Sequence, residues 1–176
     1  MKKLLCFAFL WVVPLAALAQ EEKNPVTEAV KKIMERRSQN LVAAAEEMPA
    51  DKYSYKPTEQ QMTFAHLIGH ITGANRFLCA KLSDTEPKEG ENKKGAENES
   101  KDKLVADMKA SFDECSAVLA KMDDSKLAQP VTLFGGHKST KAGALIELPV
   151  DWADHYSAAA MYLRLNGLLP PTAQKK

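Results

Sequence analysis

The chain has 176 residues, of which 24 are lysine or arginine and 23 are aspartate or glutamate, for a formal net charge of +1. This balanced charge gives no electrostatic signal for binding nucleic acid or an acidic partner. A chain of this length fits one domain with a hydrophobic core of its own.

The first residues have the pattern of a secretory signal peptide. Two lysines precede an apolar run from Leu4 to Leu18, and an Ala-Leu-Ala cleavage site stands before Gln20. The alternative is an uncleaved membrane anchor, but the run is shorter than the roughly 20 residues that a spanning helix needs. We therefore predict a signal peptide over residues 1–19 and a bacterial periplasmic or secreted domain over residues 20–176, with no stable membrane span after cleavage.

The first predicted helix begins at Pro25, a residue that suits a first helical turn. Its apolar residues recur at three- and four-residue spacing and form one stripe: Val26, Val30, Ile33, Leu41, Ala44 and Met48. Arg37 falls inside this stripe, and we expect its alkyl stem to pack while its charged head reaches water. The helix is expected to end near residues 48–57, where prolines and an aspartate mark a connection.

A second helix is predicted from Thr58, a candidate N-cap with Gln61 as its capping-box partner, to about Leu82. Its apolar stripe consists of Phe64, Leu67, Ile68, Ile71, Ala74 and Leu78. Residues 83–100 follow and contain, apart from one proline, no apolar residue larger than alanine. Because such a segment cannot bury surface, we predict a mobile, solvated loop there, within the same domain.

The third predicted helix runs from about Lys101 to Met122. Its expected core face consists of Leu104, Met108, Phe112, Cys115, Val118 and Leu119. An irregular stretch follows, in which Val131–Phe134 and the two glycines after it indicate a short extended excursion. It is long for a loop in a helical bundle, and long ordered loops often serve a functional site.

Cysteine usage leaves two alternatives open. Cys6 lies in the signal peptide, so Cys79 and Cys115 remain in the mature chain. An even number of cysteines in an oxidising compartment allows a disulfide, and two buried free thiols are the alternative.

The fourth predicted helix runs from roughly Ala144 to Asn166, and Gly167 is its stop signal. Because Pro149 lies early in this segment, we expect regular helix only from about Val150. Four helices with apolar stripes and few strand signals predict an all-α four-helix bundle, with a short irregular excursion before the last helix.

Histidines and one aspartate are the candidates for chemistry. On the fourth helix, His155 shares an inward face with Trp152, and Asp151 stands one turn earlier. On the second helix, His70 lies at the edge of the apolar stripe and His66 further toward the polar face. His70, Asp151 and His155 together would give an ion such as zinc or nickel three ligands from facing helices.

The same residues also allow an interpretation without metal. His155 would then be a hydrogen-bonded core histidine that Asp151 orients, and His66 and His70 would be half-exposed surface residues. We expect His137 to be exposed and Asp154 to be solvated in either case. No residue is singled out as catalytic.

Two segments resemble known sequences. Residues 44–82 are similar to the first half of a DinB-like domain, and residues 151–171 are similar to its last helix and tail. The most specific parts are "MPADKYSYKPT" and "YLRLNGLLPP". The resemblance implies a four-helix bundle, often dimeric, that in many members holds a metal ion through three histidines.

One of these family histidines comes from the second helix and two from an H-x3-H pair on the last. The matching positions here are His70, Asp151 and His155, so an aspartate stands where the family has the first histidine of the pair. Carboxylate can replace imidazole as a ligand. His66 does not match a family ligand position and is kept only as an additional candidate.

Two functional hypotheses follow from these observations. In the first, the chain is an exported, homodimeric DinB-like protein that acts as a metal-dependent hydrolase or transferase on an unidentified small substrate, without a nucleic-acid partner. The resemblance also implies thiol-dependent transferase or isomerase chemistry, but the low-molecular-weight thiol that it uses is not expected outside the cytoplasm. In the second hypothesis, a non-catalytic bundle binds a small molecule or a protein partner without metal.

Overall fold

The structure, a computed structural model, describes residues 23–86 and 96–174, so the predicted signal peptide lies outside the described residues. Within these two ranges no helix is both long enough and apolar enough to cross a membrane.

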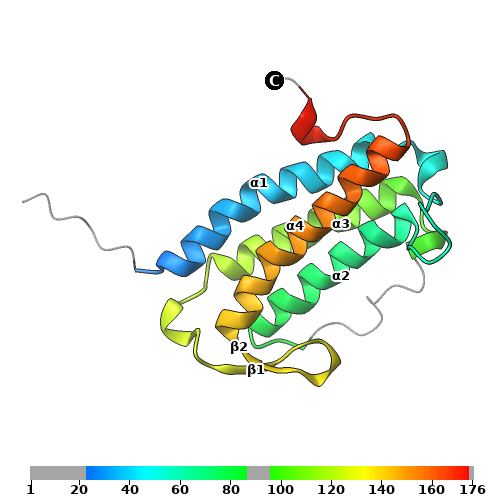
Figure 1. The fold of residues 1–176 in the computed structure, drawn as a ribbon. Helices are drawn as coiled ribbons and strands as arrows, with labels where there is room; N and C mark the ends of the chain where they lie inside the picture. The colour runs from blue at the N-terminus through cyan, green and yellow to red at the C-terminus, as the bar shows by residue number, and fades with distance from the viewer. Residues whose placement is uncertain (1–22, 87–95, 175–176) are drawn as a thin grey trace, which may run out of the picture.

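Four long helices form a bundle: α1 (Pro25–Glu47), α2 (Phe64–Leu82), α3 (Lys101–Leu119) and α4 (Lys141–Leu165). Helices α1 and α4 run in one direction, and α2 and α3 run in the other (Figure 1). Consecutive helices α2 and α3 are thus parallel, and residues 83–100 connect opposite ends of the bundle. The predicted four-helix bundle is confirmed. The length of the polar segment at residues 83–100 is explained by this topology, because the connection has to span the length of the bundle.

Short elements complete the fold: the 3-10 turns η1 (Ala50–Lys52), η2 (Ala96–Asn98), η3 (Asp124–Lys126), η4 (Phe134–Gly136) and η5 (Pro171–Ala173), and the strands β1 (Pro130–Thr132) and β2 (Lys138–Thr140). The strands pair antiparallel, with Val131 opposite Ser139, and form the predicted excursion before α4. Gly135 and Gly136 lie in the turn between them with φ of 63° and 80°, which glycine adopts without strain. Phe134 then stacks on Phe77 of α2, with ring centroids 4.0 Å apart.

The core lies between the four helices and contains most of the predicted stripe residues. Val26 is an exception, because 41% of its surface is exposed. The first turn of α1 is held by a cap instead: the Val26 and Thr27 backbone N–H groups donate to the Asp124 carboxylate, at 2.8 and 3.2 Å. Arg37 is partly buried, and its Nε is buried without a hydrogen-bond partner among the described residues, so this part of its charged head does not reach water as predicted.

The predicted start of the second helix at Thr58 is wrong. Helix α2 begins at Phe64, and the Thr63 side chain accepts a hydrogen bond from the His66 N–H. The first N–H groups of the helix, those of Phe64 and Ala65, donate to the carbonyls of Tyr55 and Tyr53. Residues 58–61 form a turn before this point, so the start of α2 is set by the preceding loop.

The predicted start of the last helix is also wrong. Helix α4 begins at Lys141, where Thr140 is the N-cap, and continues through Pro149. An interior proline costs about 3 kcal/mol. Here the fully buried Leu148 and Trp152 pack the turns on both sides of it, and this burial outweighs the cost. The helix ends as predicted, with Gly167 at a φ of 76°.

The predicted mobile loop over residues 83–100 falls partly outside the described residues. At its described end, η2 packs against α2 and Ala96 is buried. This end of the connection is therefore part of the folded domain.

Candidate metal centre

Helices α2 and α4 are antiparallel neighbours, and this arrangement brings two of the candidate histidines together. The rings of His70 and His155 lie with their centroids 4.7 Å apart. Asp151, one turn before His155, completes the group: each of the three residues offers one ligand atom, and these atoms lie within 4.8 Å of one another. This is the set of residues that the sequence predicted as metal ligands.

The three residues lie between α2 and α4 at the protein surface. His70 is exposed, whereas the side chains of Asp151 and His155 are each only 18% exposed. Trp152, which follows Asp151 in sequence, is fully buried in the core. A small molecule can therefore approach from the α2 side, while the bundle excludes water on the other.

A backbone hydrogen bond fixes the tautomer of His155. Its Nδ1 lies 2.7 Å from the backbone carbonyl oxygen of Asp151. Because a carbonyl oxygen can only accept, Nδ1 must donate, and the neutral ring then carries its lone pair on Nε2. Histidines that bind metals commonly have this bond, since it orients the ring and leaves the other nitrogen for the ion.

Asp151 has an unusual environment for a carboxylate. Its Oδ2 is buried and has no hydrogen-bond partner among the residues that the structure describes, and its Oδ1 lies 3.3 Å from Nδ1 of His155. Burial raises the pKa of this carboxyl above its ordinary value of 3.8; His155 opposes this increase in pKa, and the charges of Asp154 and Glu147 add to it. An orphaned carboxylate oxygen beside two imidazoles fits a divalent cation such as zinc or nickel.

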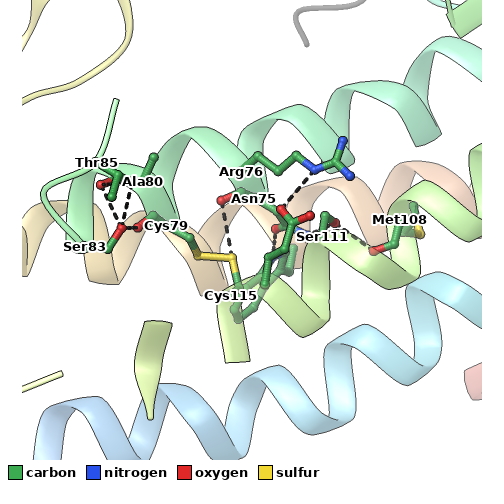
Figure 2. The surroundings of a disulfide bond; sticks show 11 residues. Asn75, Arg76, Cys79, Ala80, Ser83, Thr85, Met108, Ser111 and Cys115 are labelled. Atoms are coloured by element: carbon green, nitrogen blue, oxygen red, sulfur yellow. Dashed lines mark hydrogen bonds and ion pairs between the residues drawn. A yellow bond between two sulfur atoms is a disulfide. The ribbon is translucent and has the colours of Figure 1, made fainter. Parts of the chain in front are cut away.

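A buried polar network behind the site holds the helices in register. Asn75 Oδ1 accepts a hydrogen bond of 2.6 Å from the Trp152 indole N–H, and its Nδ2 donates to Ser111 Oγ at 3.0 Å. Ser111 donates in turn to the Met108 carbonyl, and Figure 2 shows this part of the network. Since Trp152 adjoins Asp151, the bond to Asn75 fixes the register that places His70 beside His155.

Sequence reasoning missed Asn75 and Ser111. The only local signal was a polar residue within the apolar pattern of each helix, and such residues occur at many core edges. Their partners lie on other helices, so only the packing shows what they do.

A disulfide joins Cys79 of α2 to Cys115 of α3, with their Cα atoms 5.4 Å apart (Figure 2). The Cys115 sulfur also lies 3.3 Å from the backbone carbonyl oxygen of Asn75. The sequence had left this pairing open against two free thiols.

The other candidates lie apart from the group. His66 is 40% exposed and lies 3.8 Å from a carboxylate oxygen of Glu97, so the structure does not bring it to the three clustered residues. His137 is exposed in the β-hairpin, and Asp154 is exposed on α4.

Comparison with known proteins identifies a matching family and solved structures with a similar fold. The model of the DinB superfamily matches residues 33–155. A DinB-like protein from Bacillus cereus, whose crystal structure is known, is similar to the chain with a TM-score of 0.67 and 14% identity, over 82% of this chain and 95% of that one. The DinB-like protein YjoA of Bacillus subtilis gives a TM-score of 0.62 and 20% identity, over 87% and 100%. No curated protein sequence matches the chain.

Proposed function

The chain belongs to the DinB superfamily, and on this premise we propose that it is an exported protein that binds one divalent metal ion and acts as a hydrolase or transferase on a small substrate. His70, Asp151 and His155 would hold the ion. The observation that carries the proposal is that these three residues converge where one carboxylate oxygen of Asp151 is buried without a partner among the described residues. No donor in the described part of the chain compensates the burial of that oxygen, and a cation would supply the compensation.

An ion bound by two imidazoles and a carboxylate would supply Lewis-acid polarisation of a substrate atom. The residues of the chain have roles of their own. The Asp151 carbonyl keeps the His155 ring oriented. The exposed edge at His70 leaves an approach for a substrate, and the buried Trp152 closes the opposite side.

Export is part of the proposal. The sequence of residues 1–19 supports it, and so does the disulfide between Cys79 and Cys115, because disulfides persist in oxidising compartments. A periplasmic or secreted location also separates the chain from cytoplasmic thiols, which favours hydrolysis or transfer without a thiol cosubstrate.

A homodimer is also part of the proposal. The outer face of α4, opposite its core face, carries four large, exposed apolar side chains: Ile146, Val150, Met161 and Leu165. A second copy would cover this strip. Analytical ultracentrifugation of the mature protein and of Val150→Glu tests the idea: we expect a dimer that this substitution dissociates, and a wild-type monomer would refute it.

The test of the metal site is elemental analysis of the mature protein, from Gln20 onward, purified without a histidine tag. We expect about one equivalent of zinc or nickel, and its loss in His70→Ala and in His155→Ala. His66→Ala, on the same helix but outside the group, and His137→Ala are matched controls that should keep the metal. Stoichiometric metal in both His70→Ala and His155→Ala would show that the proposed site is wrong.

A second function, binding of a small molecule or protein without metal, is favoured by one observation. Asp151 already provides His155 with a carbonyl acceptor at 2.7 Å and a carboxylate oxygen at 3.3 Å, so this pair can be stable alone. Thermal unfolding with and without a chelator separates the two functions. A bound ion raises the unfolding temperature by mass action, and an unchanged midpoint in wild-type protein would favour the second function.

A further inference from the structure

A cavity of about 270 Å³ lies away from the proposed metal site, where α2 and α3 end and α4 begins. Lys141, the first residue of α4, lines this cavity. The cavity is distant from the proposed metal site, because Asp151 lies ten residues later, about 15 Å further along the helix. One part of the wall is apolar and includes Leu82, Val118 and Met122. The proposed metal site uses none of these residues.

The wall of this cavity contains a buried cation. The Lys141 side chain is 2% exposed, and its Nζ lies 2.6 Å from Oδ2 of Asp84. An ammonium group has three N–H donors. Among the residues that the structure describes, this carboxylate oxygen is the one acceptor within hydrogen-bond distance of Nζ. A buried charge usually has its donors satisfied, so this ammonium has capacity for a further acceptor.

The backbone of Asp84 is in the left-handed conformation, which glycine adopts more readily than aspartate. Its φ of 58° makes it the one non-glycine residue with a positive φ in the described chain. It occupies the position just after the C-cap of α2, where glycine is usual. Its side chain is 70% exposed, so the carboxylate reaches Lys141 from the solvent side. An entering anion could therefore share or replace this contact.

The charge of the cavity indicates which anion fits. Lys121 and Lys126 line it together with Lys141, and Asp84 and Asp123 line it as well. Three ammonium groups against two carboxylates leave one positive charge, which matches a monoanion better than a dianion. The first backbone N–H groups of α4 already donate to loop carbonyls, so the lysine side chains would carry the recognition.

We propose that this cavity binds a small organic carboxylate. The Lys141 ammonium holds the carboxylate group, and the hydrocarbon part lies against Val118 and Met122. The proposal does not depend on the metal site, because the two sites share no residue.

The test is a titration of the mature, disulfide-bonded protein followed by the amide shifts of its NMR spectrum. The ligand is sodium hexanoate; hexanamide has the same tail without charge, and inorganic phosphate is the alternative anion. We expect saturable hexanoate shifts confined to the cavity residues, no binding of hexanamide, and at least tenfold weaker binding of phosphate. Equal binding of hexanamide, or tighter binding of phosphate, would overturn the assignment to a carboxylate.

Two substitutions act in opposite directions. Lys141→Met keeps the side-chain length and should weaken hexanoate binding at least tenfold, whereas Lys103→Met, at an exposed lysine of α3, should leave it unchanged. Asp84→Asn removes the competing charge and should strengthen binding several-fold. The absence of hexanoate binding in both wild type and Asp84→Asn would refute the proposal, and so would unchanged binding in Lys141→Met.

Discussion

Replacing Asp151 by asparagine should make the metal-free protein more stable and at the same time weaken metal binding. The substitution keeps the size of the side chain and removes its charge. Burial is the largest cause of the raised pKa of Asp151, larger than the opposing attraction of His155, so the ionised carboxylate is destabilising where it lies. An ionised carboxylate without a partner costs more to bury than the neutral amide that replaces it, by an amount on the order of 1–3 kcal/mol. Allowing for the lost attraction to His155, we expect Asp151→Asn to stabilise the metal-free protein at neutral pH by about 1–2 kcal/mol.

For a domain of this size, such a gain corresponds to a rise in unfolding temperature of about 2–8 °C. The assay is scanning calorimetry of wild type and variant, first in chelator and then with added zinc. We expect the variant to unfold at a higher temperature in chelator and to lose the increase that zinc gives the wild type. Asp113→Asn, at an exposed carboxylate on α3 that does not act on the pKa of Asp151, should change neither value. A variant that is less stable than wild type in chelator would refute the reasoning about burial, and an unchanged zinc effect would refute the role as a ligand.

Three further predictions concern the framework around the site. Asn75→Ala removes the hydrogen bonds that Asn75 makes to Trp152 and Ser111 and should lower the free energy of unfolding by about 2–4 kcal/mol, as measured by urea denaturation. A loss below about 0.5 kcal/mol would contradict the network's role. Replacing Cys79 and Cys115 by alanine opens a loop with a sequence separation of 36 and should cost about 4 kcal/mol by the same measurement; equal stability of oxidised and reduced wild type would contradict this. Burial and nearby carboxylates raise the pKa of Tyr53 above 10.0, so its neutral form stabilises the fold below that pH and the contribution is lost as the pH rises further. In a pH titration followed by phenol absorbance, Tyr53→Phe should lack one tyrosine that ionises at high pH in the wild type. A titration curve identical to that of the wild type would contradict this.

The sequence predicted those parts of the fold that depend on local pattern. The apolar stripes identified all four helices, and the ends of α2 at Leu82 and of α4 before Gly167 follow from periodicity and from the stop signal. The starts of α2 and α4 were missed for one physical reason. Carbonyls from a preceding segment cap both starts, those of Tyr53 and Tyr55 for α2 and those of Leu127 and Gln129, just before β1, for α4. Such bonds depend on how loops fold back, which a local pattern does not contain.

The candidate site divides in a similar way. The spacing of Asp151 and His155 and the place of His70 at the edge of its apolar stripe were enough to name three residues that the fold brings together, and the family resemblance points to the same three positions. The buried network was not predictable, because Asn75 acquires its role from partners on two other helices. The Lys141 cavity was missed for the same reason, since a lysine at the start of a helix is ordinarily a solvated residue.

The disulfide between the parallel helices α2 and α3 has a consequence for what a single proteolytic cut would do to the chain. The disulfide between Cys79 and Cys115 bridges the helices on either side of the connection at residues 83–100. If a protease cut the backbone once within that connection, the two fragments would remain covalently joined. One fragment would carry His70 and the other Asp151 and His155, so a nicked chain would keep all three side chains in one molecule.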